Sequence, residues 1–401
     1  MTPNKIKTLF VALLLPAILH AQATKNLTLQ QAIDLGIANS KNLKLSQNKI
    51  NESIARLAVV KDNALPSANA SFLYNHAEIT TNTLSIGGGN PIYLPNRADA
   101  FVGTAAVQEV IYAGGKYKYA QESTKTLTDV AKLDADKNKE EVSYAIINTY
   151  FSLFKVMQSK KVVAQNLESI ASQLKQAQRF FEQGIVTKND VLRFQLQQAN
   201  VSLTELEIEN NRKIINYNLD ILLGLPEDTE IAIAENELPL QTVQPLNTYI
   251  SSAFTNRQEL QQLDLQNKVA DYNIKTTKAN TRPIVGVGAN LYYINPSGGF
   301  IPASEQFIVP VTVGATISWN VASLWTNKNK VAEAKIAQQE IGLQKEVLTD
   351  NLKTELNRNY QNYQLAVKKI NVLQTSIAQA TENDRLLESK YQNNIASATD
   401  R

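Results

Sequence analysis

The feature that most constrains the fold of this chain is an internal repeat. The segment from Leu27 through Asn39 returns later in the chain as a similar segment that ends at Asn256. Pro66 and Pro283 are separated by the same number of residues as Asn39 and Asn256. A shift that stays constant over a helix start and a later proline indicates a duplicated structural unit.

Each repeat is predicted to contain a helix, a strand, a loop, a second strand, a long helix, a turn and a final helix. Thr28 is a good N-cap for the opening helix, and Pro66 ends that helix. The repeats occupy residues 24–226 and 246–401, and residues 227–245 link them. We expect the second repeat to be truncated before its final helix.

Alternation of apolar with small or polar residues predicts the strands. From Val285 to Tyr293 every second residue is apolar, and the return strand alternates in the same way up to Trp319. Strands of about ten residues can cross a bilayer when tilted, with one face toward lipid and the other toward water. The residues predicted to face lipid are Val287, Leu291, Val311 and Ile317.

The strand pattern alone leaves a second interpretation open, a soluble antiparallel sheet with one buried face. If the strands form a membrane barrel, four per chain cannot close it, since about eight is the practical minimum. Two chains would form a tight eight-stranded barrel, and three would form a twelve-stranded barrel with a lumen. A membrane barrel therefore requires the chain to oligomerise.

A long uninterrupted helix is the second element with clear consequences. Residues 116–181 contain neither proline nor glycine, which predicts a helix on the order of 100 Å long at 1.5 Å per residue. Such a helix needs partner helices in a coiled coil or helical barrel. The chain reverses at Gly184, and Gly224 followed by Pro226 ends the returning helix. The predicted fold is mainly α-helical with a β part in a membrane.

The first 23 residues have the pattern of a secretory signal peptide. Lys5 and Lys7 precede an apolar stretch over residues 9–19, and a small-x-small cleavage site ends at Ala23. The alternative is a short buried helix. The chain has no cysteine, which excludes disulfides, thiolate metal sites and a lipid anchor on an N-terminal cysteine.

Composition gives no sign of an enzyme or of a nucleic-acid partner. The formal net charge is only +3, which does not suit nucleic-acid binding. Of the two histidines, His20 lies in the predicted signal peptide and His76 in a predicted loop. One mature histidine supports neither a two-histidine metal site nor a catalytic triad. We expect no catalysis, no cofactor and no metal.

The motifs of the chain resemble those of the TolC-type outer-membrane efflux proteins, also called outer membrane factors. The resemblance extends from about Leu27 to the end of the chain. It is carried by Leu27-Thr28-Leu29-x-x-Ala32-Ile33, Leu65-Pro66, Tyr112-Ala113-Gly114-Gly115-Lys116, the turn from Phe181 to Leu192, and Leu223-Gly224-Leu225-Pro226. The chain departs from the pattern at Asn394-Ile395, where the family usually has Gly-Leu, and at residues 320–325, which replace a glycine pair.

The resemblance implies a homotrimer in the outer membrane of a Gram-negative bacterium. Its twelve-stranded barrel would continue into a helical tunnel that docks a periplasmic membrane-fusion adaptor and, through it, an inner-membrane transporter. The channel would conduct exported solutes passively. Two other classes are an adhesive coiled-coil protein and the adaptor itself, which would carry a lipoyl-like β-module that the sequence lacks. The sequence does not identify the exported substrate.

The resemblance also implies two functional sites close to the helix turns. The adaptor-docking tip consists of Gly184, Ile185, Val186 and Thr187, together with Asn394 and Ile395 of the second repeat. The periplasmic gate consists of Asn189, Asp190, Tyr391 and Asp400, with a hydrogen bond from the Tyr391 hydroxyl to Asp190. Alternatively, Asp190 and Asp400 cap the helices that follow the turns.

Overall fold

The computed structural model describes residues 24–78, 80, 83–84, 87–93, 96–234, 243–296 and 308–393. The predicted signal peptide, residues 1–23, lies outside this described part. The chain forms two compact units. Among the described residues, the helical unit comprises 24–43, 139–234 and 372–393, and the sheet unit lies within 44–138 and 243–371.

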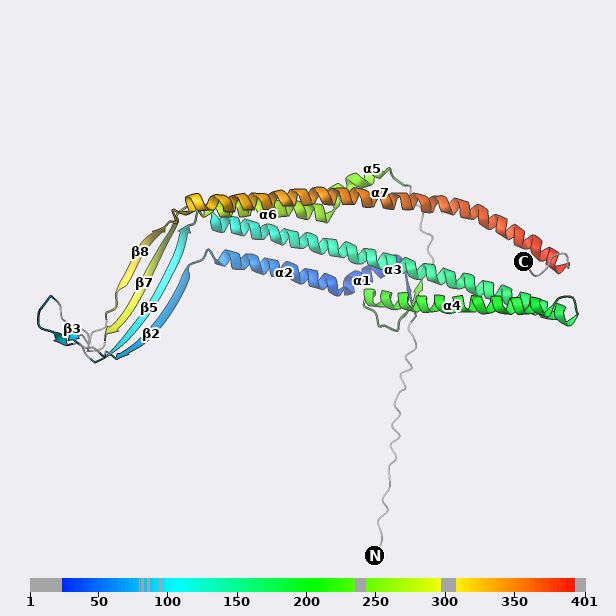
Figure 1. Cartoon of the computed structure of the whole chain (residues 1–401), viewed down its shortest axis with the longest axis horizontal. Coiled ribbons are helices and arrows are strands. Elements are labelled where there is room, and N and C mark those ends of the chain that lie inside the picture. The colour runs from blue at the N-terminus through cyan, green and yellow to red at the C-terminus, as the bar shows by residue number, and fades with distance from the viewer. Residues whose placement is uncertain are drawn as a thin grey trace, which may run out of the picture. The chain divides into compact units, whose positions relative to one another are not determined.

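The elements follow one another in an order that repeats (Figure 1). They are β1 (Thr24–Leu27), α1 (Leu29–Asn39), α2 (Lys41–Asp62), β2 (Ser67–Glu78), β3 (Thr83–Leu84), β4 (Ile92–Tyr93), β5 (Arg97–Tyr112), α3 (Lys116–Glu182), α4 (Lys188–Leu223), β6 (Glu230–Ile233), α5 (Leu246–Asn256), α6 (Gln258–Ala279), β7 (Ile284–Pro296), β8 (Val311–Ser318) and α7 (Ser323–Gln392). Two helices, a strand pair and a long helix thus occur twice, as a duplication would produce. Across the described ranges, no helix is long and apolar enough to cross a membrane.

The predicted opening helix of each repeat is in fact two helices. Ser40 separates α1 from α2 with an extended ψ of 117°, and its hydroxyl accepts a hydrogen bond from the Leu43 amide at 3.3 Å. In the second repeat Arg257, with ψ of 119°, separates α5 from α6 in the same way. The prediction of one continuous helix was wrong because Ser40 ends one helix and caps the next.

The helical unit is built around a short parallel strand pair and the helices that cover it. β1 pairs with β6 in register from Thr24 opposite Glu230 to Leu27 opposite Ile233. The Tyr150 hydroxyl on α3 donates to the Leu27 carbonyl at 3.0 Å. The buried side chains that form this core are Leu27, Ala32, Ile146, Tyr150, Leu153, Leu219, Leu223 and Ile231.

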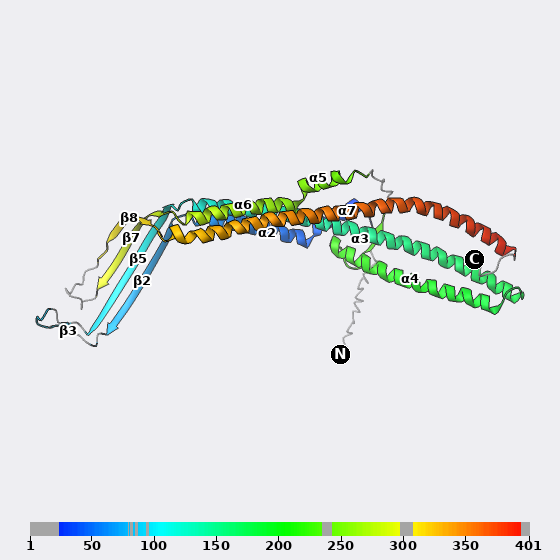
Figure 2. The same cartoon turned by 45° about the horizontal axis from the view of Figure 1, so that its top comes forward.

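The sheet unit contains one four-stranded antiparallel sheet in the order β2-β5-β7-β8 (Figure 2). The strand predicted from Val285 to Tyr293 corresponds to β7, and the return strand predicted up to Trp319 corresponds to β8, which ends at Ser318. β2 pairs with β5 over its whole length, β5 pairs with β7, and β7 pairs with β8. Within the described residues, β2 and β8 are the edges of the sheet.

The sheet joins its helices through a tight turn that explains the Ala-Gly-Gly motif. Gly114 has φ of +65°, and a Cβ atom there would lie 2.9 Å from the Arg282 side chain. Arg282 donates to the Gly114 carbonyl at 3.0 Å, and Trp319 donates to the Thr281 carbonyl at 3.0 Å. Only glycine allows both this backbone conformation and this close approach.

Candidate functional site

The strand register divides the side chains of the sheet between two faces. The apolar face comprises Ala68, Ala70, Phe72, Tyr74, Phe101, Gly103, Ala105, Val107, Val285, Val287, Ala289, Leu291, Tyr293, Val311, Val313, Ala315 and Ile317. It includes all four residues predicted to contact lipid. Val311 and Ile317 are 65% and 74% exposed, so the described part of the chain leaves these positions of the face uncovered. Lipid contact at these positions stays a prediction.

The opposite face, here called the polar face, is lined mainly by small and polar side chains. Ser71 and Thr104 share a hydrogen bond of 2.7 Å across β2 and β5. Asn290 donates to the Thr312 hydroxyl at 3.4 Å across β7 and β8. These groups satisfy one another and remain exposed, which suits a surface in contact with water.

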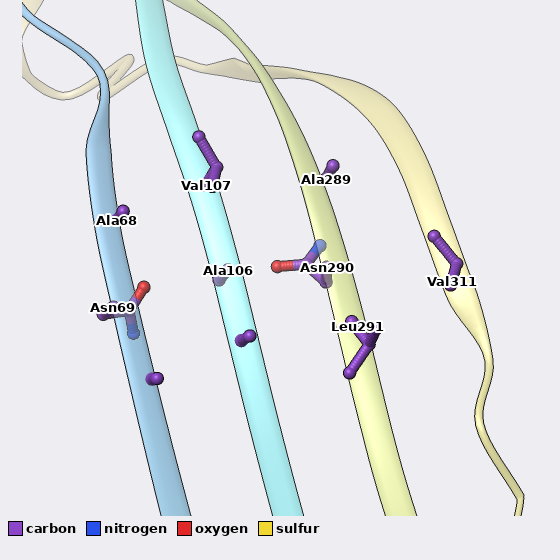
Figure 3. Close-up of a pocket in the computed structure, with 10 residues that line it drawn as sticks. Ala68, Asn69, Ala106, Val107, Ala289, Asn290, Leu291 and Val311 are labelled. Atoms are coloured by element: carbon purple, nitrogen blue, oxygen red, sulfur yellow. The ribbon is translucent and has the colours of Figure 1, made fainter.

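Small side chains hollow the middle of the apolar face. Figure 3 shows Ala68, Val107 and Ala289 on three adjacent strands, where the register places them side by side. Together with Leu291 and Val311 they line an open concavity of about 440 Å³. Asn69 and Asn290 also border it, but most of its lining is apolar, which fits flexible hydrocarbon better than a polar solute.

Aromatic and ionisable residues follow the hollow at one end of the apolar face. The ring centroids of Tyr74 and Phe101 are 4.9 Å apart. The Tyr74 hydroxyl donates to Asp99 at 2.8 Å, and His76 Nδ1 lies 2.7 Å from the same carboxylate oxygen. This cluster links β2 to β5 close to the loop that connects them.

The predicted docking tip is an exposed turn between α3 and α4. Gly184 has φ of +73°, and the Ile185 amide donates to the Phe180 carbonyl at 2.9 Å, which closes the end of α3. Phe181 and Ile185 are 44% and 50% exposed. A Cβ atom at Gly184 would meet no atom within 4 Å. The turn therefore presents apolar side chains around an open position.

At the predicted gate, the structure gives Asp190 a capping role. One of its carboxylate oxygens accepts from the Thr187 hydroxyl at 2.7 Å and from the Thr187 amide at 2.9 Å. These two bonds lower the pKa of Asp190 below its ordinary value of 3.8. Asn189 lies beside it in the first turn of α4.

The second half of the predicted tip and gate is not placed by the structure. Tyr391 lies in the last turn of α7, but its side chain is outside the described part. Asn394, Ile395 and Asp400 also lie outside the described residues. The hydrogen bond between Tyr391 and Asp190 therefore stays a prediction.

A buried carboxyl group on α4 was not identified from the sequence. Asp220 is 0% exposed, and Asn216 donates to it at 3.0 Å. Asn216 also donates to the Thr229 carbonyl at 2.7 Å and accepts from the Ile231 amide at 2.9 Å, so it fastens β6 to α4. Burial, and then the charges of Asp228 and Glu230, raise the pKa of Asp220 to about 7.

An ion-pair cluster lies beside this buried group. Arg212 donates to Glu209 at 2.8 and 3.0 Å and also pairs with Glu230, while Lys160 donates to Glu209 at 2.6 Å. The two hydrogen bonds from Arg212, assisted by the one from Lys160, lower the pKa of Glu209 to about 2. The cluster joins α3, α4 and β6, and its groups are already paired.

Among the described residues, no group of three or more histidine, aspartate or glutamate side chains could hold a metal ion. The prediction that His76 lies in a loop was wrong: it lies in β2 opposite Asp99 of β5, and its ring contacts that carboxylate. The features that the structure brings together are therefore surfaces: an exposed apolar sheet face, an exposed polar sheet face and an exposed helical tip.

Comparison with known proteins defines the class of fold. No family model matches the chain, and no curated protein matches it. Among solved structures, VceC of Vibrio cholerae, an outer membrane protein, superposes with a TM-score of 0.74 at 16% identity over 93% of this chain and 87% of its own. The CmeC outer membrane channel of Campylobacter jejuni superposes with a TM-score of 0.72 at 18% identity over 93% and 78%.

The open state of the MtrE outer membrane channel of Neisseria gonorrhoeae gives a TM-score of 0.68 at 14% identity over 93% of this chain and 81% of its own. Identities this low establish the fold alone. The chain therefore has the fold of these outer-membrane channels, which agrees with the fold that the resemblance of its motifs implies.

Proposed function

We propose that the chain is one subunit of a trimeric outer-membrane channel that passively conducts solutes exported by an inner-membrane pump. The observation that carries this proposal is the antiparallel sheet, with one apolar and one polar face, in a chain that has the fold of outer-membrane channels. An adhesive coiled-coil protein needs no such sheet. The polar face would line the lumen, and the apolar face would contact lipid.

The direction of the edge strands allows several copies to close a barrel. Successive strands of the sheet are antiparallel, so β2 and β8 run in opposite directions. β8 of one copy can therefore pair with β2 of the next in the antiparallel manner. Three copies give twelve strands and a lumen, whereas two give a tight eight-stranded barrel that side chains fill.

Export would require partners in the periplasm and the inner membrane. We infer that the exposed turn around Gly184 docks a membrane-fusion adaptor and that the pump supplies the energy. The gate formed by Asn189, Asp190, Tyr391 and Asp400 would close the periplasmic mouth at rest. Capping by Asp190 is compatible with this role, since one carboxylate oxygen holds Thr187 and the other can accept a further donor.

The membrane assignment is tested by placing a charge on the apolar face. Replacing Val311 with arginine should cost about 2–4 kcal/mol near the middle of the bilayer, because the charge loses its water. We expect much less assembled trimer in outer-membrane fractions, measured by heat-modifiable migration on gels. Thr312→Arg is the matched control, since its side chain lies on the polar face and should assemble. Normal assembly of Val311→Arg would remove the barrel assignment.

The docking assignment is tested at Gly184. Gly184→Trp should abolish export while the trimer still assembles, because the bulky ring blocks the partner at a position where a Cβ atom meets no other atom of the chain within 4 Å. Gly184→Ala is the control for the positive φ, which costs a non-glycine residue about 1–2 kcal/mol. Export measured with both variants separates the two effects. Unimpaired export by the tryptophan variant at normal protein levels would show that the turn has no docking role.

A further inference from the structure

A carboxylate lies on the apolar face at the end nearer the helices. Glu109 on β5 lies opposite Val287 of β7, and the register shift follows only at Val110. Residues opposite each other in a sheet share a face, so Glu109 belongs to the apolar face. On its other side β2 begins only at Ser67, opposite Gln108. The nearest strand neighbour of Glu109 therefore offers its carboxylate no polar group.

A second set of ionisable residues lies on the same face at the other end of β5. Asp99 accepts from Tyr74 and contacts His76, and one level further Arg97 pairs with Glu78 at 3.4 Å. Between Asp99 and Glu109, the apolar positions of β5 hold Phe101, Gly103, Ala105 and Val107. The apolar positions of β2, β7 and β8 at these levels are also uncharged.

The separation of these two levels matches the thickness of a membrane. Asp99 and Glu109 are about ten residues apart, which corresponds to roughly 33 Å along a strand at ~3.3 Å per residue. A strand tilt of about 40° reduces this to roughly 25 Å along the membrane normal, the height of the apolar band of outer-membrane barrels. Uncharged residues fill this height, and ionisable residues lie at both limits.

We propose that Glu109 binds the ammonium group of a phospholipid at the membrane surface nearer the helices, while the cluster of Tyr74, His76 and Asp99 lies at the opposite surface. This inference rests on the proposed membrane barrel. A carboxylate that projects toward lipid is stabilised where cationic groups and water are present, and headgroups supply both. An ammonium headgroup fits better than an anionic one, because Glu109 would repel a headgroup with net negative charge.

The two levels can be tested with single cysteines, since these 401 residues contain none. Trimers in vesicles of phosphatidylethanolamine and phosphatidylglycerol would react with a membrane-impermeant maleimide. Glu109→Cys and His76→Cys should react at least about tenfold faster than Ala105→Cys, which lies in the apolar band. Ala106→Cys, on the polar face, is the control for reaction through a water-filled lumen.

The outcomes separate this inference from the proposed function. If Ala105→Cys reacts as fast as Glu109→Cys, the face is not covered by lipid and the barrel proposal itself fails. If Ala105→Cys and Glu109→Cys are equally protected, the barrel proposal is retained, but the placement of Glu109 at the lipid headgroups is wrong. If His76→Cys alone reacts slowly, the placement of its cluster at the opposite membrane surface is wrong.

Lipid retention tests the headgroup chemistry. In native mass spectrometry of trimers from mixed vesicles, the wild type should retain phosphatidylethanolamine over phosphatidylglycerol by about threefold more than Glu109→Gln does, as expected for one exposed ion pair. Glu109→Asp should restore much of the preference. Glu78→Gln is a control that should change nothing, because Glu78 lies at the opposite level. Equal preference in the wild type and Glu109→Gln would overturn the ammonium contact.

Discussion

Local stability of the α4–β6 region is expected to fall by roughly 4 kcal/mol as the pH rises from about 4 to 7, because Asp220 must ionise in a buried position. Its folded-state pKa of about 7 lies above the ordinary 3.8. Between these values the folded state binds more protons than the unfolded state, so rising pH favours unfolding. Below this window both states are protonated, and above it the full penalty is present.

Hydrogen exchange of the Ile231 amide measures this effect, since that amide donates to Asn216, which in turn donates to Asp220. Asp220→Asn keeps the shape but cannot ionise. At each pH, the difference in protection between variant and wild type removes the intrinsic pH dependence of exchange. The variant should match the wild type near pH 4 and exceed it at pH 8. Equal protection at both values would mean that Asp220 is not buried as an acid.

Asp228→Asn provides a second arm of the same experiment. Asp228 is the first charge, after burial itself, that raises the pKa of Asp220. Its removal should move the midpoint of the pH-dependent loss of protection to lower pH without abolishing the loss. A variant at Asp228 that behaves like Asp220→Asn would indicate that the two carboxyl groups had been assigned wrongly.

Leu219→Ala should destabilise the helical unit by about 2–5 kcal/mol, the usual cost of a cavity left by a buried leucine. Leu219 is fully buried, and it belongs to the cluster that contains Ile146, Leu153 and Leu223. The loss should appear as faster exchange in α4 and as a lower midpoint of chemical unfolding.

Ile221→Ala is the matched control for this prediction. Ile221 lies two residues along the same helix, but its side chain is 53% exposed. Its truncation should cost less than about 1 kcal/mol of local stability, as is usual for surface positions. Equal losses for the two variants would show that the Leu219 cluster is not the core that holds the helical unit together.

The strands and their faces could be predicted from the sequence, because in a β-strand every second side chain lies on the same face. Val287 and Val311 could be assigned to one face before their pairing was known. The turn at Gly184 was accessible for a similar reason, since a glycine between two long helical segments indicates a left-handed residue. These features depend on neighbouring residues only, so short sequence patterns predict them.

The features that sequence reasoning missed depend on distant pairing. The strand at Thr24 pairs with residues near Glu230, and a four-residue strand leaves no periodic signal. In the sequence, Asp220 cannot be distinguished from other polar residues of the helix, because its burial depends on where β6 packs. The helix break at Ser40 did have a signal, since serine is a good N-cap, but continuing apolar spacing across it obscured the break.

The open edges β2 and β8 also have a consequence for the life of the newly made protein. An unpaired strand edge accepts any compatible strand, including one from a partly folded copy. A subunit that has not yet assembled can therefore add further copies edge to edge without limit. The addition ends only when the sheet curves enough for its last edge to pair with its first. Cells that make this protein in excess should accumulate ladders of misjoined subunits unless a holdase keeps both edges occupied until the proposed barrel closes.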